Sequence, residues 1–321
     1  MSRRLQANLS LVVCSLIWGS TFVIVGRALA DASVFPFLAA RFTLAALLMG
    51  AISLAELRQL SKLQIWRGVL IGMFMFGGYV FQTIGLLYTT PSKAAFVTGF
   101  SVVLVPAFMA LFWTTHANVW VLAGALASLA GLYCLTVPAN GFTDIDFGSL
   151  LVLGCAVSFA FHIIFIGRYS AGFSVKALSF LQLATTAILS LVTLPLLAAL
   201  RPKSLRFQMT ADLVIAILVT ALLATVLAFS LQVWAQRRAT ASSTALILAL
   251  EPLFAAVTSF FVLRERLGAR ALLGAALILA GIVVVELKGP APVAVDVLAD
   301  LAIGPSNCVR REEGIETCNQ G

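Results

Sequence analysis

Three ionisable side chains lie deep inside long apolar segments, where a charged group is stable only if it is paired, hydrogen-bonded or in contact with a bound ligand. Glu251 has twelve residues free of Asp, Glu, Lys and Arg on each side, Arg41 lies about seven residues inside an apolar segment, and His162 occupies a third. Burying a charge is costly unless the charge is paired or hydrogen-bonded. These residues are therefore the candidates for a polar binding site inside the molecule.

Each of the three has a functional and a structural interpretation. The Glu251 carboxyl can bind a cationic group or a proton, or it can satisfy backbone groups freed by Pro252 or pair with Arg41. The Arg41 guanidinium can clamp a carboxylate bidentately, or reach back to the surface, or neutralise Glu251. For His162, packing or a hydrogen bond between helices is the favoured interpretation.

Neutral residues inside the apolar segments supply aromatic walls and amide groups that suit a zwitterionic or aromatic solute. They are Trp18, Tyr79, Gln82, Tyr88, Gln182, Gln232 and Trp234. Aromatic residues near helix ends usually belong to the interfacial belt, which applies to Tyr88 and Trp234. Gln82 lies deeper and is ranked first as a cavity residue. The predicted substrate-binding set is Trp18, Arg41, Gln82, His162 and Glu251.

Little in the sequence supports an enzyme or a bound cofactor. It has no Gly-rich phosphate loop and no Cys/His cluster with metal-ligand spacing, so ATP-driven transport and metal chemistry are not indicated. Gly99-Phe100-Ser101 with His162 as base would fit an intramembrane serine protease. That alternative gives the duplicated sequence described below no role.

The composition is that of a polytopic membrane protein: 61% of the residues are hydrophobic, 11% are charged, and the mean hydropathy is +1.05. A helix of about 20 residues crosses the hydrocarbon core. The apolar pattern predicts ten helices, at 8–26, 34–55, 68–88, 92–113, 118–138, 148–168, 177–200, 213–235, 240–263 and 269–287. The polar hairpin at 114–118 divides an uncharged run that is too long for one span.

The two halves of the chain share the order in which proline and glycine residues occur in their apolar segments. Pro106 is followed by Gly124-Ala125 and Gly131, and Pro252 by Gly274-Ala275 and Gly281. Five helices in each half make the second copy enter the membrane from the opposite side, so we expect an all-α membrane protein with two inverted five-helix repeats. An offset of 141 in the numbering aligns Trp18 with Phe159, and an offset of 146 aligns the two prolines.

The expected domains are a first repeat at 1–140, a second repeat at 147–288 and a disordered tail at 289–321. The recurring glycines predict a close-packed seam in the scaffold or, alternatively, a homodimer contact. The basic residues of the first loops favour a cytoplasmic N-terminus, and an even number of helices then places both termini in the cytoplasm, with the chain in the plasma membrane. The net charge of +8 is assigned to loops near anionic lipid and not to nucleic acid.

The sequence resembles the drug/metabolite transporter superfamily, in its ten-helix EamA-type branch. The residues that carry the resemblance are Ile17 to Phe22, Ala40-Arg41-Phe42, Leu250-Glu251-Pro252, and Leu263 to Leu267 leading into Gly274. The resemblance covers residues 8 to 287 and implies a multipass transporter, often an exporter of amino acids, metabolites or drugs, with a central cavity between the repeats. The first helix lacks the acidic residue of the small four-helix members, so their proton-coupling route does not carry over.

Together these observations predict a secondary transporter, an exporter of small metabolites such as amino acids or amphipathic drugs, that works by alternating access. A passive channel or facilitator and a non-transporting membrane scaffold are the alternatives. The expected partners are a small-molecule solute and the lipid bilayer.

Overall fold

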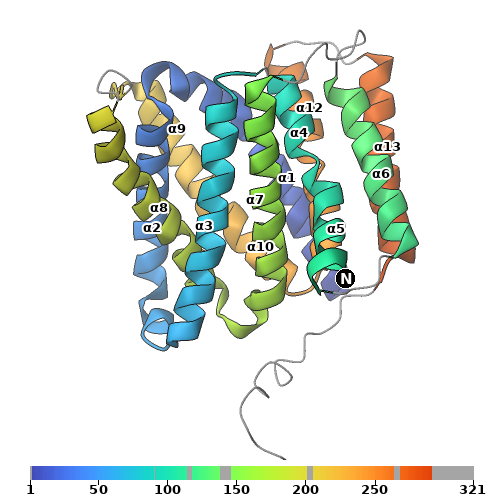
Figure 1. Ribbon diagram of the computed structural model, residues 1–321, viewed down its shortest axis with the longest axis horizontal. Helices are drawn as coiled ribbons and strands as arrows, with labels where there is room; N and C mark the ends of the chain where they lie inside the picture. Colours follow the sequence, from blue (N-terminus) through green and yellow to red (C-terminus); the bar gives the residue numbers. More distant parts are fainter. Residues whose placement is uncertain are drawn as a thin grey trace, which may run out of the picture.

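The computed structural model describes residues 2–89, 91–113, 118–137, 146–200, 205–263 and 268–290. Most of these residues lie in helices that run side by side (Figure 1). The helices are α1 (Arg3–Asp31), α2 (Val34–Leu57), α3 (Lys62–Gly85), α4 (Pro91–Thr98), α5 (Ser101–Trp113), α6 (Val119–Thr136), α7 (Phe147–Tyr169), η1 (Ser170–Gly172), α8 (Val175–Leu200), α9 (Ala211–Ala221), η3 (Leu222–Leu227), α10 (Ala228–Gln236), α11 (Ala241–Leu248), α12 (Glu251–Leu263) and α13 (Ala269–Lys288). The expected tail beyond residue 290, residues 114–117 of the predicted hairpin and residues 264–267 of the motif lie outside the described residues.

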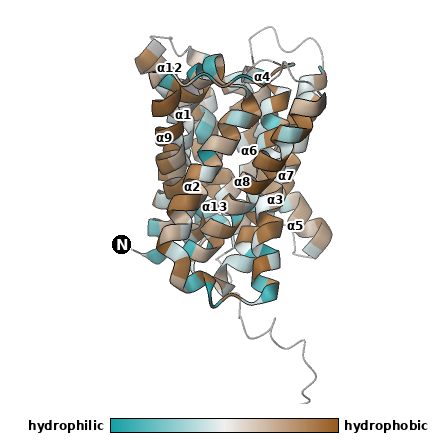
Figure 2. Cartoon of the chain, turned by 90° about the vertical axis from the view of Figure 1, so that its left-hand side faces the viewer, coloured by the Kyte–Doolittle hydropathy of each residue, from teal (hydrophilic) through white to brown (hydrophobic). Residues whose placement is uncertain are grey.

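The described residues contain nine helical segments long and apolar enough to cross a membrane, and α1, bent by 41° beyond Thr21, makes a tenth if it is one span. Hydrophilic residues lie mostly toward the two ends of the bundle, and hydrophobic residues cover the helices between them (Figure 2). Several helices begin with a side-chain cap, as at Ser61, Asp146 and Thr240, which satisfies backbone N–H groups that the helix itself leaves free. The predicted all-α membrane architecture is confirmed.

Three of the spans are interrupted. The fourth consists of α4 and α5 with a break at Gly99-Phe100, and the ninth consists of α11 and α12 with a break at Ala249-Leu250. In the eighth span, α9 and α10 are joined by η3, a turn of π-helix. Irregular backbone at membrane depth is tolerated where it is buried in protein or lines a cavity, so these breaks mark the interior of the molecule.

The helix bounds give the register of the two halves. The first residues of α4, α5 and α6 are related to those of α11, α12 and α13 by an offset of 150 in the numbering, and the first residue of α2 is related to that of α8 by an offset of 141. The offset of 141 predicted for the first helices is found between the second helices, α2 and α8. The predicted equivalence of Pro106 and Pro252 is wrong, because Pro252 is the second residue of α12 whereas Pro106 is the sixth of α5.

The contacts between helices show the same relation between the two halves, because a contact remains a contact when each helix is replaced by its counterpart in the other half. Helix α6 packs on α13 and α2 packs on α8, which pairs each helix with its counterpart. The contact of α3 with α7 has its counterpart in the contact of α10 with α1. This pattern is the one expected when two copies of a five-helix unit are related by a two-fold exchange.

The recurring glycines form a seam within the chain. An added Cβ at Gly131 would lie 2.6 Å from the Gly274 carbonyl oxygen, and one at Gly124 would lie 2.7 Å from the Gly281 carbonyl oxygen. The backbones of α6 and α13 can approach this closely because neither helix carries a side chain there. The scaffold interpretation of these glycines is confirmed, and they give no support to a homodimer contact.

Each face of the bundle carries polar contacts between the two halves. On the face away from the N-terminus, Ala32 and Phe207 form an antiparallel bridge, the Ser33 N–H donates to the Arg206 carbonyl at 2.7 Å, and the Thr210 hydroxyl donates to Asp31 at 2.5 Å. We call residues 31–33 with 206–210 the far clasp.

The contacts on the face that carries the N-terminus form a second clasp. There the Gln64 amide donates to the Gly172 carbonyl at 2.6 Å, and Lys176 pairs with Glu56 at 3.3 Å. We call these four residues the near clasp. The far clasp joins the α1–α2 turn to the segment before α9, and the near clasp joins the α7–α8 turn to the ends of α2 and α3, so the two are counterparts under the exchange of halves.

Candidate functional site

Arg41 lies within α2 and is 4% exposed. Its Nε donates to the Thr225 hydroxyl at 2.7 Å, and its Nη2 lies 3.3 Å from both the Ala224 carbonyl and the Tyr79 hydroxyl. The guanidinium also lies 5.2 Å from the centre of the Tyr79 ring. The side chain therefore points into the molecule and does not reach back to the surface.

The partners of Arg41 come from the π-helical turn η3. In this turn the Thr225 hydroxyl donates to the Thr220 carbonyl at 2.8 Å, and the Ala224 carbonyl accepts a second bond, from the Trp18 indole at 2.8 Å. Single π-helical turns within α-helices occur frequently at functional sites. Two of the predicted site residues, Trp18 and Arg41, thus meet at one backbone carbonyl of the other half.

Glu251 is the first residue of α12, and this position removes one structural interpretation. Pro252 lies in the first helical turn, where a missing N–H is not needed for an intrahelical bond, so Glu251 is not required to compensate for it. The helix N-terminus also favours a negative charge. Within the described residues the Glu251 carboxyl has no hydrogen-bond or ion-pair partner, and the predicted alternative of a salt bridge to Arg41 is not formed there.

The surroundings of Glu251 place it beside the Arg41 cluster. A Cβ added at Gly19, next to Trp18, would lie 2.6 Å from the Glu251 carbonyl oxygen, so the backbones of α1 and α12 are in close contact. Trp18 in turn donates to the Ala224 carbonyl, to which Arg41 also donates. Glu251 of one half and Arg41 of the other therefore both lie close to the turn of α1 that contains Trp18 and Gly19.

A chain of aromatic rings links the same residues across the halves. Trp18 lies 5.1 Å from Phe229, Phe229 lies 5.9 Å from His162, and Phe159 lies 6.4 Å from His162 and 5.7 Å from Tyr79. Most of these contacts are edge-to-face, the arrangement that aromatic quadrupoles favour. The chain offers a continuous aromatic wall beside the charged groups.

The aromatic chain obeys the two-fold exchange of the halves. Trp18 and Phe159 differ by 141, the offset of α2 and α8. Tyr79 and Phe229 differ by 150, which is the offset of 149 between the first residues of α3 and α9 plus one residue for the π-helical turn η3. The contact of Trp18 with Phe229 is therefore the counterpart of the contact of Phe159 with Tyr79. By the same offsets Arg41 corresponds to Gln182, so only one half carries the cation.

The two remaining predicted residues, His162 and Gln82, differ in their hydrogen bonding. His162 is 1% exposed and its Nε2 lies 2.9 Å from Oε1 of Gln182, which is the hydrogen bond between helices expected for it. Gln82 is half-buried one turn beyond Tyr79, and no described residue hydrogen-bonds its side chain. The structure thus brings Trp18, Arg41, His162 and Glu251 to one cluster and places Gln82 at its edge.

Sequence reasoning did not find Thr225, Phe159 and Phe229 as members of the site. Thr225 lies in an uncharged run in which nothing marks a π-helical turn, and phenylalanine is the most frequent aromatic residue of this chain. The alignment of Trp18 with Phe159 was the one signal that could have identified a Phe as a site residue.

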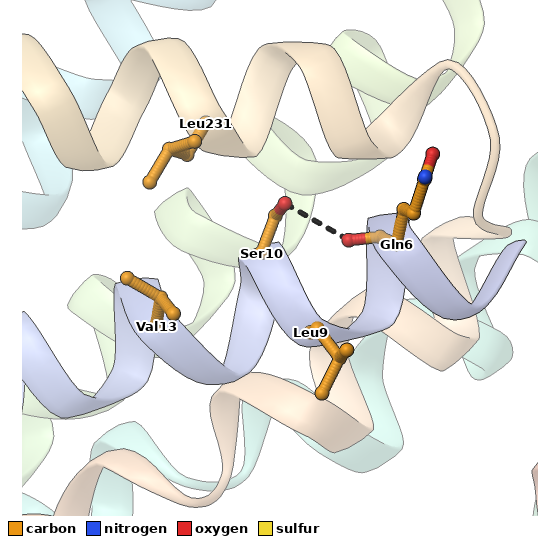
Figure 3. Close-up of a pocket in the computed structure, with 5 residues that line it drawn as sticks. All are labelled: Gln6, Leu9, Ser10, Val13 and Leu231. Atoms are coloured by element: carbon orange, nitrogen blue, oxygen red, sulfur yellow. Dashed lines mark hydrogen bonds between the residues drawn. The ribbon is translucent and has the colours of Figure 1, made fainter. Parts of the chain in front are cut away.

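A separate groove of about 380 Å³ lies between α1 and α10 and is lined by Gln6, Leu9, Ser10, Val13 and Leu231 (Figure 3). Leu9 and Val13 are 45% and 42% exposed, as expected for side chains that face lipid. None of the predicted site residues lines this groove, so we do not assign the solute site to it.

Comparison with known proteins agrees with this architecture. The model of the EamA-like transporter family matches residues 5–137 and again residues 146–287. An uncharacterized transporter of Archaeoglobus fulgidus is 35% identical over 292 residues, which cover 89% of this chain and 87% of the relative. A solved crystal structure with 20% identity superposes with a TM-score of 0.71 over 88% of this chain and 96% of the other, which shows a shared fold.

Proposed function

Because the chain belongs to the EamA-like transporter family, we propose that it is a secondary transporter that exports a small zwitterionic metabolite by alternating access. The observation that carries this proposal is that two charged residues at membrane depth, one from each half, lie next to the same part of α1. Arg41 shares the Ala224 carbonyl with the Trp18 indole, and the backbone at Glu251 contacts Gly19. Charged residues at membrane depth that face the interior typically mark a solute or ion pathway.

The chemistry of the cluster fits a zwitterion with an apolar or aromatic body. A guanidinium has five N–H groups, and Arg41 uses three hydrogen bonds on protein acceptors, which leaves N–H groups for a carboxylate. The free Glu251 carboxyl suits an ammonium group. The aromatic chain from Trp18 to Tyr79 suits the body of the solute.

The two clasps support alternating access over a passive pore. Each clasp joins the two halves at one face of the bundle, so opening one while the other stays closed exposes the interior to one side at a time. A facilitator needs no such reciprocal arrangement. Transport that does not depend on either clasp would favour a channel, and the absence of transport would favour a scaffold.

We further propose that the chain lies in the plasma membrane with both termini in the cytoplasm. Arg4 in α1 pairs with Glu286 in α13 at 3.0 Å, so the beginning of the first described helix and the end of the last one lie at the same face. That face also carries Arg58 after the end of α2, Lys62 at the start of α3 and Lys176 at the start of α8. A reporter that is active only outside the cytoplasm, fused after residue 321, should be silent, and an active fusion would contradict this orientation.

The solute itself is found by comparing metabolites released from cells with and without the protein. We expect a zwitterionic amine to accumulate outside the expressing cells and not outside cells that express Glu251→Gln at the same level. Equal release of the solute from cells with and without the wild-type protein would contradict the proposed export.

A further inference from the structure

A second polar cluster lies between α7, α8 and α10, and the Arg41 cluster does not use most of it. Its members are between 0% and 2% exposed: His162, Gln182, Gln232 and Gln236. Polar side chains buried this completely are normally hydrogen-bonded within the protein. Each of these four side chains should therefore find its partners inside the bundle.

Two short chains of hydrogen bonds meet at α7. His162 Nε2 lies 2.9 Å from Gln182 Oε1. Gln232 Nε2 donates to Gln236 Oε1 at 3.0 Å, and Gln236 Nε2 donates to the carbonyl of Ile163 at 2.8 Å. Because Ile163 directly follows His162, both chains end at the same turn of α7.

In each of the two chains of hydrogen bonds, one buried polar atom has no partner among the described residues. Gln182 Nε2 and Gln232 Oε1 are buried and have no hydrogen-bond partner among the described residues. Flipping either amide, so that its oxygen and nitrogen change places, still leaves one atom without a partner. A buried polar group without a partner is destabilising, so a donor and an acceptor without partners in one cluster require an explanation.

The exchange of halves gives the cluster a position relative to the first site. Gln182 is the counterpart of Arg41 at the offset of 141, and Gln232 is the counterpart of Gln82 at the offset of 150. Arg41 lies near the face with the far clasp, whereas Gln182 and Gln232 lie toward the end of the bundle with the N-terminus. The second cluster is therefore the uncharged counterpart of the first, in the opposite half of the membrane.

We propose that Gln182 and Gln232 form a second solute subsite, which binds an uncharged group that can both donate and accept a hydrogen bond, such as a side-chain hydroxyl or primary amide. The inference rests on the proposed transport function. Gln182 Nε2 donates to the oxygen of the solute, and Gln232 Oε1 accepts its O–H or N–H. A neutral subsite of this kind selects for polarity and still releases the solute, as a carrier requires.

The test compares two solutes that differ by one hydroxyl group, threonine and valine, in proteoliposomes. Methionine is unbranched like glutamine, so the double variant Gln182→Met and Gln232→Met removes both unpartnered atoms without cutting a cavity. In the wild type we expect threonine to be preferred, and in the double variant we expect the threonine to valine ratio to fall by roughly three- to tenfold. Valine transport should persist.

The matched control is Gln6→Met, which makes the same change on the exposed side of α1 and should leave the ratio unchanged. A double variant that keeps the wild-type ratio would overturn the subsite, because its polar atoms would then have no part in selecting the solute. The double variant also removes the hydrogen bonds from Gln182 to His162 and from Gln232 to Gln236, so its melting temperature is measured together with the transport ratio, and the ratio is taken only from folded protein.

Failure of the proposed function is distinguishable from failure of the subsite. The transport proposal is tested separately, by the comparison of released metabolites. If the wild type transports neither threonine nor valine, the subsite is tested by binding instead, with propionamide, a small primary amide. A rise in melting temperature in the wild type that the double variant lacks would support the subsite. Equal shifts, or no shift in either protein, would overturn it.

Discussion

The Arg41 guanidinium and the Thr225 hydroxyl are joined by a hydrogen bond of 2.7 Å although 184 residues separate them in the chain. The bond connects the second span of the first half to the π-helical turn in the eighth span. It is buried, and its donor is charged, which makes it stronger than a neutral hydrogen bond. The two halves of the molecule are therefore coupled at the point where the solute site is proposed.

This bond predicts the effect of removing its acceptor. Thr225→Val keeps the shape of the side chain and leaves the charged Nε without its partner, so we expect a loss of stability of about 1 to 3 kcal/mol. The control is Thr220→Val on the same span, whose hydroxyl bonds only within its own helix, to the carbonyls of Ala216 and Ile217. Thermal unfolding in detergent measures both variants, and equal losses would contradict a special role for Thr225.

A second prediction concerns Glu251. Glu251→Gln preserves size and some hydrogen bonding but removes the charge, so we expect a folded protein that transports at least about tenfold more slowly. Melting temperature and transport are measured on the same preparation. A lower melting temperature with unchanged transport per folded molecule would show that Glu251 only supports the structure.

The far clasp predicts that a covalent bond across it stops the cycle. Residues opposite each other in an antiparallel bridge have Cα atoms about 4.5 to 5.5 Å apart, within the range of a disulfide. Ala32→Cys with Phe207→Cys should therefore form a disulfide under oxidation, arrest transport and recover it on reduction. Each single variant serves as the control, and full transport by the oxidised double variant would show that this clasp does not open.

The glycine seam predicts opposite effects for the same substitution at two positions. Gly131→Ala places a Cβ 2.6 Å from the Gly274 carbonyl oxygen, so α6 and α13 must move apart and the protein should lose stability. Gly26→Ala meets nothing within 4 Å and should leave stability unchanged or raise it by about 0.5 to 1 kcal/mol, as alanine favours a helix. Melting temperatures that fall equally in both variants would contradict the seam.

Asp146 gives a prediction with a defined pH dependence. The hydrogen bond from Lys93, at 3.0 Å, followed by the backbone N–H of Ser149, holds the pKa of this carboxyl well below its ordinary value of about 3.9. A depressed pKa contributes stability above the unfolded pKa, and this contribution is lost as the pH falls below about 4. Asp146→Asn should thus lower the melting temperature at pH 7 and change it less at pH 3.

The sequence predicted the architecture well because that architecture follows from long-range composition. Apolar runs of spanning length and the glycine pairs Gly124/Gly131 and Gly274/Gly281 each reflect a strong physical constraint, and the spans and the seam are found where these predict. The proline alignment failed because Pro106 and Pro252 take different places in their helices. A proline is compatible both with a first helical turn and with a bent interior.

The site was only partly predictable, and for a different reason. Cost of burial identifies Arg41 and Glu251 from sequence, since a charge at depth must have a partner or a purpose. Which residues contact Arg41 and Glu251 depends on the directions of their side chains and on the π-helical turn at Thr225. No residue type in the sequence predicts that turn. The preference of Arg41 for Thr225 and Ala224 over Glu251 is a property of the folded arrangement.

Counterflow tests the central claim most directly, namely that opposite charges from the two halves form one alternating-access site. The purified protein is reconstituted into liposomes loaded with an unlabelled zwitterionic amino acid, and entry of the labelled solute is followed. We predict that the internal solute accelerates entry in the wild type, that Glu251→Gln abolishes this acceleration, and that Arg27→Gln, at an exposed position near the end of α1, preserves it. Entry that is independent of the internal solute, or acceleration that survives Glu251→Gln, would contradict the account.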